Sequence, residues 1–135
     1  MNFNLERFKK AQAKDYLQAL EEMKSGQKVS HWMWYIFPQL KGLGYSSISQ
    51  FYGIDGRAEA KAYIEDEILK KRLIEISETL LGLKSSNATD VMDYPDDLKL
   101  KSCMTLFSEV APGIDCFTRK VLWRGERQKD SGDFE

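Results

Sequence analysis

The residues best suited to chemistry lie close together in this chain of 135 residues, between Lys28 and Tyr52. This segment contains the only histidine, His31, together with two of the three tryptophans and the Gly-Leu-Gly sequence at 42–44. Histidine has an unperturbed pKa near neutrality, so His31 is a candidate catalytic proton-transfer group or anion-binding residue. The sequence identifies no nucleophile or carboxylate partner for it. A structural histidine that hydrogen-bonds the following loop is the alternative.

The aromatic residues beside His31 would suit a flat ligand. Trp32 and Trp34 could each stack on a base or another flat group. On a helix, however, residues two apart point about 200° away from each other. We therefore expect one of the two tryptophans in the core and the other at a pocket or on the surface.

The loop that follows the aromatic run is a candidate phosphate-binding loop. Glycine-rich loops can present amide groups to a phosphate, and neighbouring hydroxyl and lysine side chains can assist. The candidate residues here are Lys41, Gly42, Gly44 and Ser46. They do not match the P-loop pattern, and a simple turn is the alternative.

Three further polar residues are candidates for the same pocket. Lys99 lies on the edge of an apolar helical stripe, where a partly buried ammonium needs an acidic or ligand partner. Arg7 and Gln12 lie on the first expected helix. We expect Arg7, Gln12, His31, Gln39 and Lys99 to converge beside the glycine loop.

The elements expected to position these residues are helices. Apolar residues recur at helical spacing in three long segments, 5–24, 67–83 and 95–110. Gln12 lies within the apolar stripe of the first segment, and Ser25-Gly26 is expected to end that helix. Five shorter helical segments are also expected. The first follows Ser30, which caps it; the others lie over 47–52, from about 56, over 87–92 and from Asp115 through Trp123. No convincing strand pair is present. The sequence predicts an all-α fold: one compact, irregular bundle of about six helices in residues 1–124, with one ordered Trp/Pro/Gly-rich loop segment and a charged, mobile tail over 125–135.

The composition narrows the function classes. There are 20 Lys and Arg against 21 Asp and Glu, so no basic excess favours a nucleic-acid partner. No signal peptide or membrane span is recognisable, so we expect a cytoplasmic protein with reduced Cys103 and Cys116. One histidine and two cysteines cannot supply a usual zinc site, and we expect neither metal nor cofactor.

The sequence also carries a recognisable signature. SHWMWYIFPQLKGLGYS, with LERFKKAQ before it and PDDLKLKSCMTLF after it, resembles the bacterial family of unknown function DUF1810 over about residues 3–122. The resemblance implies a single all-α domain and leaves the activity open. The ending departs from the family pattern, because Trp123-Arg124-Gly125 runs directly into a charged tail.

Three functional hypotheses follow. In the first, the Lys28–Tyr52 segment binds, and in an enzymatic version processes, a small phosphorylated ligand such as a nucleotide or an ADP-ribose derivative. In the second, exposed aromatic residues make the domain a non-catalytic protein-interaction module. In the third, the aromatic segment is a packing motif that ties the bundle together. The oligomeric state is left open.

Overall fold

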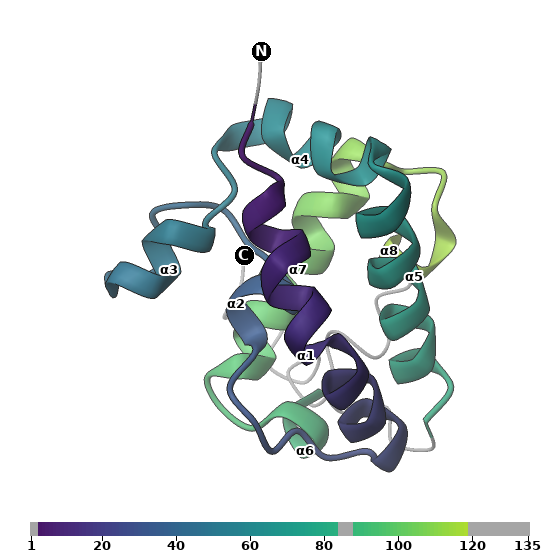
Figure 1. The fold of residues 1–135 in the computed structure, drawn as a ribbon. Helices are drawn as coiled ribbons and strands as arrows, with labels where there is room; N and C mark the ends of the chain where they lie inside the picture. The colour runs from purple at the N-terminus through teal and green to yellow at the C-terminus, as the bar shows by residue number, and fades with distance from the viewer. Residues whose placement is uncertain (1–2, 84–87, 119–135) are drawn as a thin grey trace, which may run out of the picture.

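The computed structural model describes residues 3–83 and 88–118, and every regular element within them is a helix (Figure 1). The all-α fold is thus confirmed, although short turns raise the number of helices in these residues to eight. They are α1 (Glu6–Ser25), α2 (Met33–Ile36), α3 (Ser47–Tyr52), α4 (Gly56–Glu65), α5 (Glu67–Leu81), α6 (Ala88–Met92), α7 (Asp96–Val110) and α8 (Asp115–Thr118). The expected continuation of the last helix to Trp123 and the tail over 125–135 lie outside the described residues.

The first helix follows the pattern in its sequence. The buried side of α1 carries Phe8, Tyr16 and Met23 at helical spacing. It ends at Gly26, which adopts a left-handed conformation with φ of 85° and donates its N–H to the carbonyls of Glu22 and Met23. This left-handed stop favours glycine and explains why the helix ends there.

The core lies where five helices meet. α1 packs against α5 and α2, and α4 packs against α5 and α7; Figure 1 shows α1 in front of α7, with α5 along one side. Phe8 and Tyr63 make an edge-to-face contact at 5.1 Å, and Tyr63 also packs on Phe107. The interior therefore consists largely of aromatic and branched aliphatic side chains drawn from distant parts of the chain.

Both cysteines lie in this core, outside any disulfide between described residues. Cys103 on α7 and Cys116 on α8 are buried. Burial raises the pKa of the Cys103 thiol well above its ordinary value. Cys103 therefore acts as a small apolar packing residue and is a poor nucleophile.

The segment that carries α3 projects from this core. Residues 40 and 54 form an isolated parallel bridge, in which the Lys41 N–H donates to the Ile54 carbonyl at 2.8 Å and the Ile54 N–H donates to the Gln39 carbonyl at 2.9 Å. None of the α3 residues is buried, and Figure 1 shows the helix standing out from the bundle. The backbone bonds close the base of this loop, so α3 is held at a fixed place beside α2.

A close backbone approach at the base of the loop requires glycine. A Cβ atom added to Gly53 would lie 2.5 Å from the Cα atom of Lys41. The two backbone segments at the loop base can approach this closely only because Gly53 has no side chain.

No helix in the described ranges, 3–83 and 88–118, combines the length and the apolar character needed to cross a membrane.

Candidate functional site

The first half of the aromatic segment is bound tightly to α1 through Glu22. This carboxylate accepts hydrogen bonds from the backbone N–H groups of Val29 and Ser30 at 2.8 and 3.0 Å, and from Trp32 Nε1 at 2.9 Å. Its second oxygen accepts from Ser30 Oγ at 2.6 Å and from Gln18 Nε2 at 3.0 Å. Five donors thus fix the turn that precedes α2.

This network determines the ionisation of Glu22. Burial by itself would raise the pKa of the carboxyl group, but the hydrogen bonds from Ser30, Val29 and Trp32 outweigh burial and lower the pKa to about 2. Glu22 is therefore a stably ionised structural acceptor. The network also corrects the prediction that Ser30 caps the next helix: Ser30 binds Glu22 instead, and the helix begins two residues later, after Trp32.

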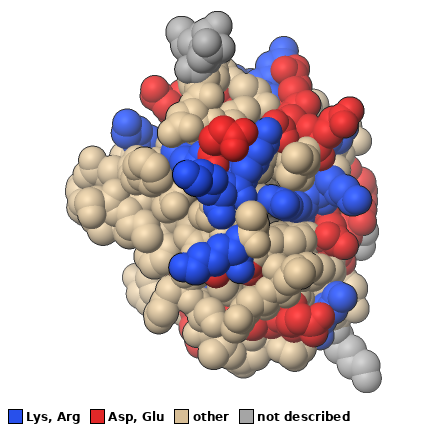
Figure 2. All heavy atoms as spheres, viewed as in Figure 1, with Lys and Arg blue, Asp and Glu red and all other residues tan. Residues whose placement is uncertain are grey.

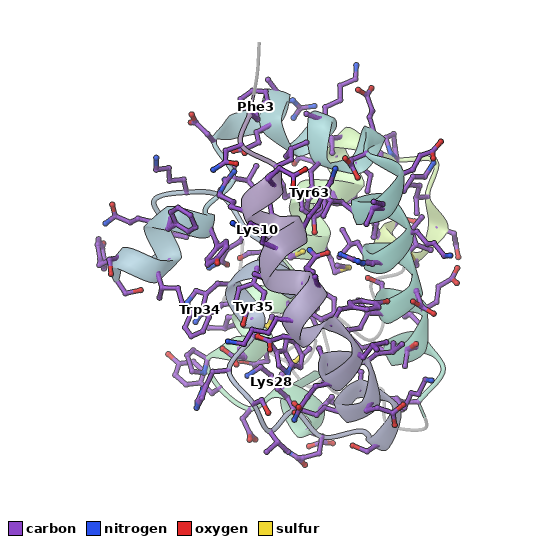
Figure 3. All side chains as sticks on the ribbon, viewed as in Figure 1. Phe3, Lys10, Lys28, Trp34, Tyr35 and Tyr63 are labelled. Atoms are coloured by element: carbon purple, nitrogen blue, oxygen red, sulfur yellow. The ribbon has the colours of Figure 1, made fainter. Side chains whose placement is uncertain are left out.

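The two tryptophans differ as expected. Trp32 is 1% exposed and lies in the core, whereas Trp34 is only partly buried. Figure 3 shows Trp34 on the side of the molecule from which α3 projects. Of the two candidate stacking residues, Trp34 alone offers an accessible face, and Trp32 is a packing residue.

A groove of about 510 Å³ lies beside Trp34, between the projecting loop and α7. We call it the Trp34 groove. Its lining comes from three parts of the chain: Trp34 and Gln39; the loop and α3 residues Leu43, Gly44, Tyr45, Ser46 and Ser49; and the α7 residues Pro95, Leu98, Lys99 and Ser102. Five of the predicted ligand-binding residues therefore line one hollow: Trp34, Gln39, Gly44, Ser46 and Lys99.

Lys99 is the charged residue among those that line the groove, and it belongs to a row of three charged side chains. Lys28 Nζ lies 2.9 Å from Asp96 Oδ2, and Lys99 Nζ lies 3.5 Å from Asp96 Oδ1. One carboxylate is thus shared by two ammonium groups, with the shorter contact to Lys28, and the row carries a net charge of +1. Lys28 is 7% exposed, whereas Lys99 is 30% exposed, so the uncompensated charge faces the groove at Lys99.

Lys99 is also paired with the partly buried tryptophan, Trp34. Its Nζ atom lies 5.6 Å from the ring centroid of Trp34, within cation–π range. On the buried side, Lys28 Nζ lies 4.9 Å from the ring of Trp32. The expectation that Lys99 needs an acidic partner is met by Asp96. An ammonium group with three donors still has capacity for a second anion.

Two residues expected at the pocket are instead structural. Arg7 donates to the carbonyls of Phe51 and Gly53 and forms an ion pair with Glu59 at 2.8 Å, so it fastens the loop base to α1 and α4. Arg7 has four such acceptors, because it also donates to the Asn4 carbonyl, and none of its contacts faces the Trp34 groove.

Gln12 is also part of the interior. It is 1% exposed, and its amide donates to the Tyr35 carbonyl at 2.8 Å and to the Tyr63 hydroxyl at 3.0 Å. Its amide oxygen accepts from Arg72 at 3.3 Å. The predicted convergence of five polar residues is therefore wrong in this respect: only Gln39 and Lys99 of that set line the groove.

The remaining predicted residues lie at the surface. His31 is exposed, and among the described residues its imidazole makes no hydrogen bond or ion pair; the groove lining does not include it. Lys41 and Gly42 are exposed on the projecting loop, and Gly42 has a positive φ of 99°. Neither lines the groove, so of the four candidate phosphate-binding residues only Gly44 and Ser46 do.

Sequence reasoning missed several groove residues. Ser49 and Ser102 supply hydroxyl groups to the lining that the sequence analysis did not predict, whereas Tyr45, which is 92% exposed, belongs to the candidate phosphate-binding loop. One signal was available: residues 42–54 contain no charged residue in a chain that is 30% charged. Figure 2 shows the projecting lobe as mostly uncharged atoms, with a positively charged group at its upper edge, in contrast to the many charged groups on the face formed by α1.

A second large hollow, of about 620 Å³, lies on the outer side of α5. In the described part of the chain, its lining comes from this one helix, and five of its seven residues are Lys or Glu. With a single wall and no aromatic or hydroxyl-rich side, it offers a ligand less than the Trp34 groove does.

Comparisons with known proteins agree with this architecture. The family model described as "Protein of unknown function (DUF1810)" matches residues 2–131, so the chain belongs to that family. The chain is similar to the crystal structure of the conserved hypothetical protein Rv1873 from Mycobacterium tuberculosis, at 40% identity and a TM-score of 0.84, covering 89% of this chain and 84% of the other. No curated protein matches the chain.

Proposed function

We propose that this member of the DUF1810 family binds a small anionic ligand with a flat group, such as a nucleotide or an ADP-ribose derivative, in the Trp34 groove. The observation that carries the proposal is the position of Lys99. Its ammonium group lies beside the Trp34 ring and shares Asp96 with Lys28, so a positive charge and an aromatic face meet in one hollow.

The other groove residues suit such a ligand. The Ser102 hydroxyl can donate to a phosphate oxygen, and Gln39 can read the edge of a base. The hydroxyl groups of Ser46 and Ser49 donate to Ser49 Oγ and to the Ser46 carbonyl, so they line the groove as polar surface. The Trp34 face can stack on a flat ring, which contributes about 1–3 kcal/mol in known complexes. The proposal is one of binding, because His31, the predicted proton-transfer residue, does not line the groove.

The test uses two variants that separate the two parts of the ligand. Lys99→Gln should weaken both inorganic phosphate and nucleotides about tenfold or more, because a charge-assisted contact contributes roughly 1.5–3 kcal/mol. Trp34→Leu should weaken nucleotides about fivefold or more and leave inorganic phosphate unchanged. Binding is measured by calorimetry and by the rise in melting temperature that a native-state ligand produces.

Lys61→Gln provides the matched control, because Lys61 is an exposed lysine on α4 outside the groove. Equal losses in Lys61→Gln and Lys99→Gln would mean that the effect is one of net charge only. Failure of nucleotides, ADP-ribose, sugar phosphates and phosphate to bind the unaltered protein would refute the proposal.

A second candidate, a protein-interaction module, is favoured by the exposed apolar residues of the projecting loop. Leu43 and Phe51 are 56% and 55% exposed, and such residues are typical anchors at interfaces. The variants above separate the candidates, since a partner held by Leu43 and Phe51 would not depend on Lys99.

A further inference from the structure

Another hollow, distinct from the one on α5, adjoins the Trp34 groove along α7. It has a volume of about 500 Å³ and is lined by Leu40, Leu43, Leu98 and Leu106, with Lys101, Ser102, Thr105 and Glu109. We call it the leucine hollow. Leu43, Leu98 and Ser102 line both spaces, so the two adjoin and share a wall.

The two spaces differ in chemistry. The Trp34 groove holds a lysine, an amide, several hydroxyl groups and an indole ring, whereas four leucines dominate the adjoining hollow. The α7 residues that line them, from Pro95 to Glu109, recur at helical spacing on one side of the helix. Lys99 and Leu106 are seven residues apart, which corresponds to about 10 Å along the helix axis.

Two of the four leucines of this hollow are exposed, whereas Leu106 is buried. Leu40 and Leu43 are 39% and 56% exposed, on the loop whose base is closed by the bridge to Ile54. An accessible apolar surface is covered favourably by an apolar group, at about 0.8 kcal/mol for each buried methylene. Because this surface adjoins a groove with a positive charge, one molecule with an anionic end and an apolar end would satisfy both.

We infer that the ligand of the Trp34 groove carries an apolar chain, and that this chain lies in the leucine hollow while the anionic group contacts Lys99. This inference rests on the proposed function and narrows its ligand to an anion that carries an apolar chain as well as the flat group facing Trp34. Alkyl phosphates, which carry only the anionic group and the chain, are the probes of these two parts. The occupant is a single dissolved molecule. A lipid within a bilayer presents the same chemistry and is tested separately.

The experiment is a chain-length series. Inorganic phosphate and methyl, butyl, hexyl and octyl phosphate are titrated into the full-length protein by calorimetry, each below its micelle concentration. The association constant should rise about two- to fourfold for each added methylene until the chain passes Leu106; complete burial of a methylene corresponds to the upper value.

Two leucine variants locate the chain. Leu40→Ser should reduce the association constant of octyl phosphate at least threefold and leave that of methyl phosphate unchanged, because Leu40 lines only the leucine hollow. Leu17→Ser is the matched control, since Leu17 is 75% exposed on α1 and lines neither space. It should leave both constants unchanged.

The outcomes separate the two proposals. If methyl phosphate binds and octyl phosphate binds no more tightly, the chain does not lie in the leucine hollow and only the present inference fails. If inorganic phosphate, nucleotides and every ester fail to bind, the proposed function fails as well. A gain with chain length that Leu17→Ser reduces as much as Leu40→Ser would overturn the inference, because the chain would then be adsorbed non-specifically.

Vesicles provide the final arm. If vesicles containing phosphatidic acid bind the protein while dissolved octyl phosphate does not, the leucine hollow faces a membrane surface and the inference of a single dissolved ligand is overturned.

Discussion

Replacing Glu22 by glutamine should lower the stability of the fold and flatten its dependence on pH. The pKa of this carboxyl group falls from an ordinary value of 4.5 to about 2 in the folded protein. At 1.36 kcal/mol for each pKa unit, this difference corresponds to about 3 kcal/mol in favour of the folded state when Glu22 is ionised.

The sign of the pH effect follows from the direction of the change in pKa. Above about pH 5.5 the carboxylate is ionised in both the folded and the unfolded chain, so the full contribution is present. Between about pH 5 and pH 2 the unfolded chain takes up a proton that folded Glu22 does not, so stability declines. Below about pH 2 the contribution is gone.

Glutamine keeps one of the two acceptor oxygens. It can still accept from Val29, Ser30 and Trp32, which all bind the same Glu22 oxygen. It places an NH₂ group where Gln18 and the Ser30 hydroxyl donate. We therefore expect Glu22→Gln to lose about 2–3 kcal/mol at pH 7 and much less at pH 2.5.

The assay is urea denaturation followed by far-UV circular dichroism, at half-unit intervals from pH 2.5 to pH 7. Asp66, whose pKa is also lowered through its contact with Lys9 and despite burial, contributes to the acid sensitivity of both proteins. The difference between the two curves isolates Glu22. Glu21→Gln is the control. The Glu21 side chain is 75% exposed, and its ion pair with Lys24 is long, at 3.9 Å, so it contributes little to stability. Parallel curves for the unaltered protein and Glu22→Gln would refute the reasoning.

Two further variants test the loop and the histidine. Gly53→Ala should destabilise the protein by about 1–3 kcal/mol, because its Cβ atom would lie 2.5 Å from Lys41 Cα; Gly113→Ala, with nothing within 4 Å of its Cβ, should change stability by less than about 0.5 kcal/mol. Equal unfolding midpoints in urea for these two variants would contradict the close approach. His31→Ala should change neither the free energy of unfolding by more than about 0.5 kcal/mol nor the Kd of a bound nucleotide, because the imidazole is exposed and outside the groove. A large loss of nucleotide affinity in His31→Ala would show that His31 takes part in binding.

The sequence predicted those features that depend on local spacing. The stripe on α1, its stop at Gly26 and the division of Trp32 and Trp34 between core and surface are confirmed. Each follows from helical periodicity or from the backbone freedom of glycine within a few residues. The buried position of Gln12 was predicted in the same way, from its place within an apolar stripe.

The failures share a different cause, which is competition from residues distant in sequence. Ser30 is a good helix cap by type, but Glu22, eight residues earlier, takes both its N–H and its hydroxyl group. Arg7 was available for a ligand by type, but the loop carbonyls at 51 and 53 are its acceptors. Which partner a polar side chain finds depends on the tertiary fold, and spacing along one helix does not reveal it.

The packing-motif hypothesis and the proposed ligand site concern different halves of the same aromatic segment. Trp32 is bound to Glu22 and covered by Lys28, and this half ties the turn before α2 to α1. Lys28 continues to Asp96, and Asp96 to Lys99, which lies beside Trp34. The buried contacts therefore hold the Asp96 carboxylate in place. Because Asp96 is shared with Lys28, it neutralises the charge of Lys99 only in part. A change that loosened the Trp32 half would move Asp96 and so alter the charge that the Trp34 groove offers to an anion.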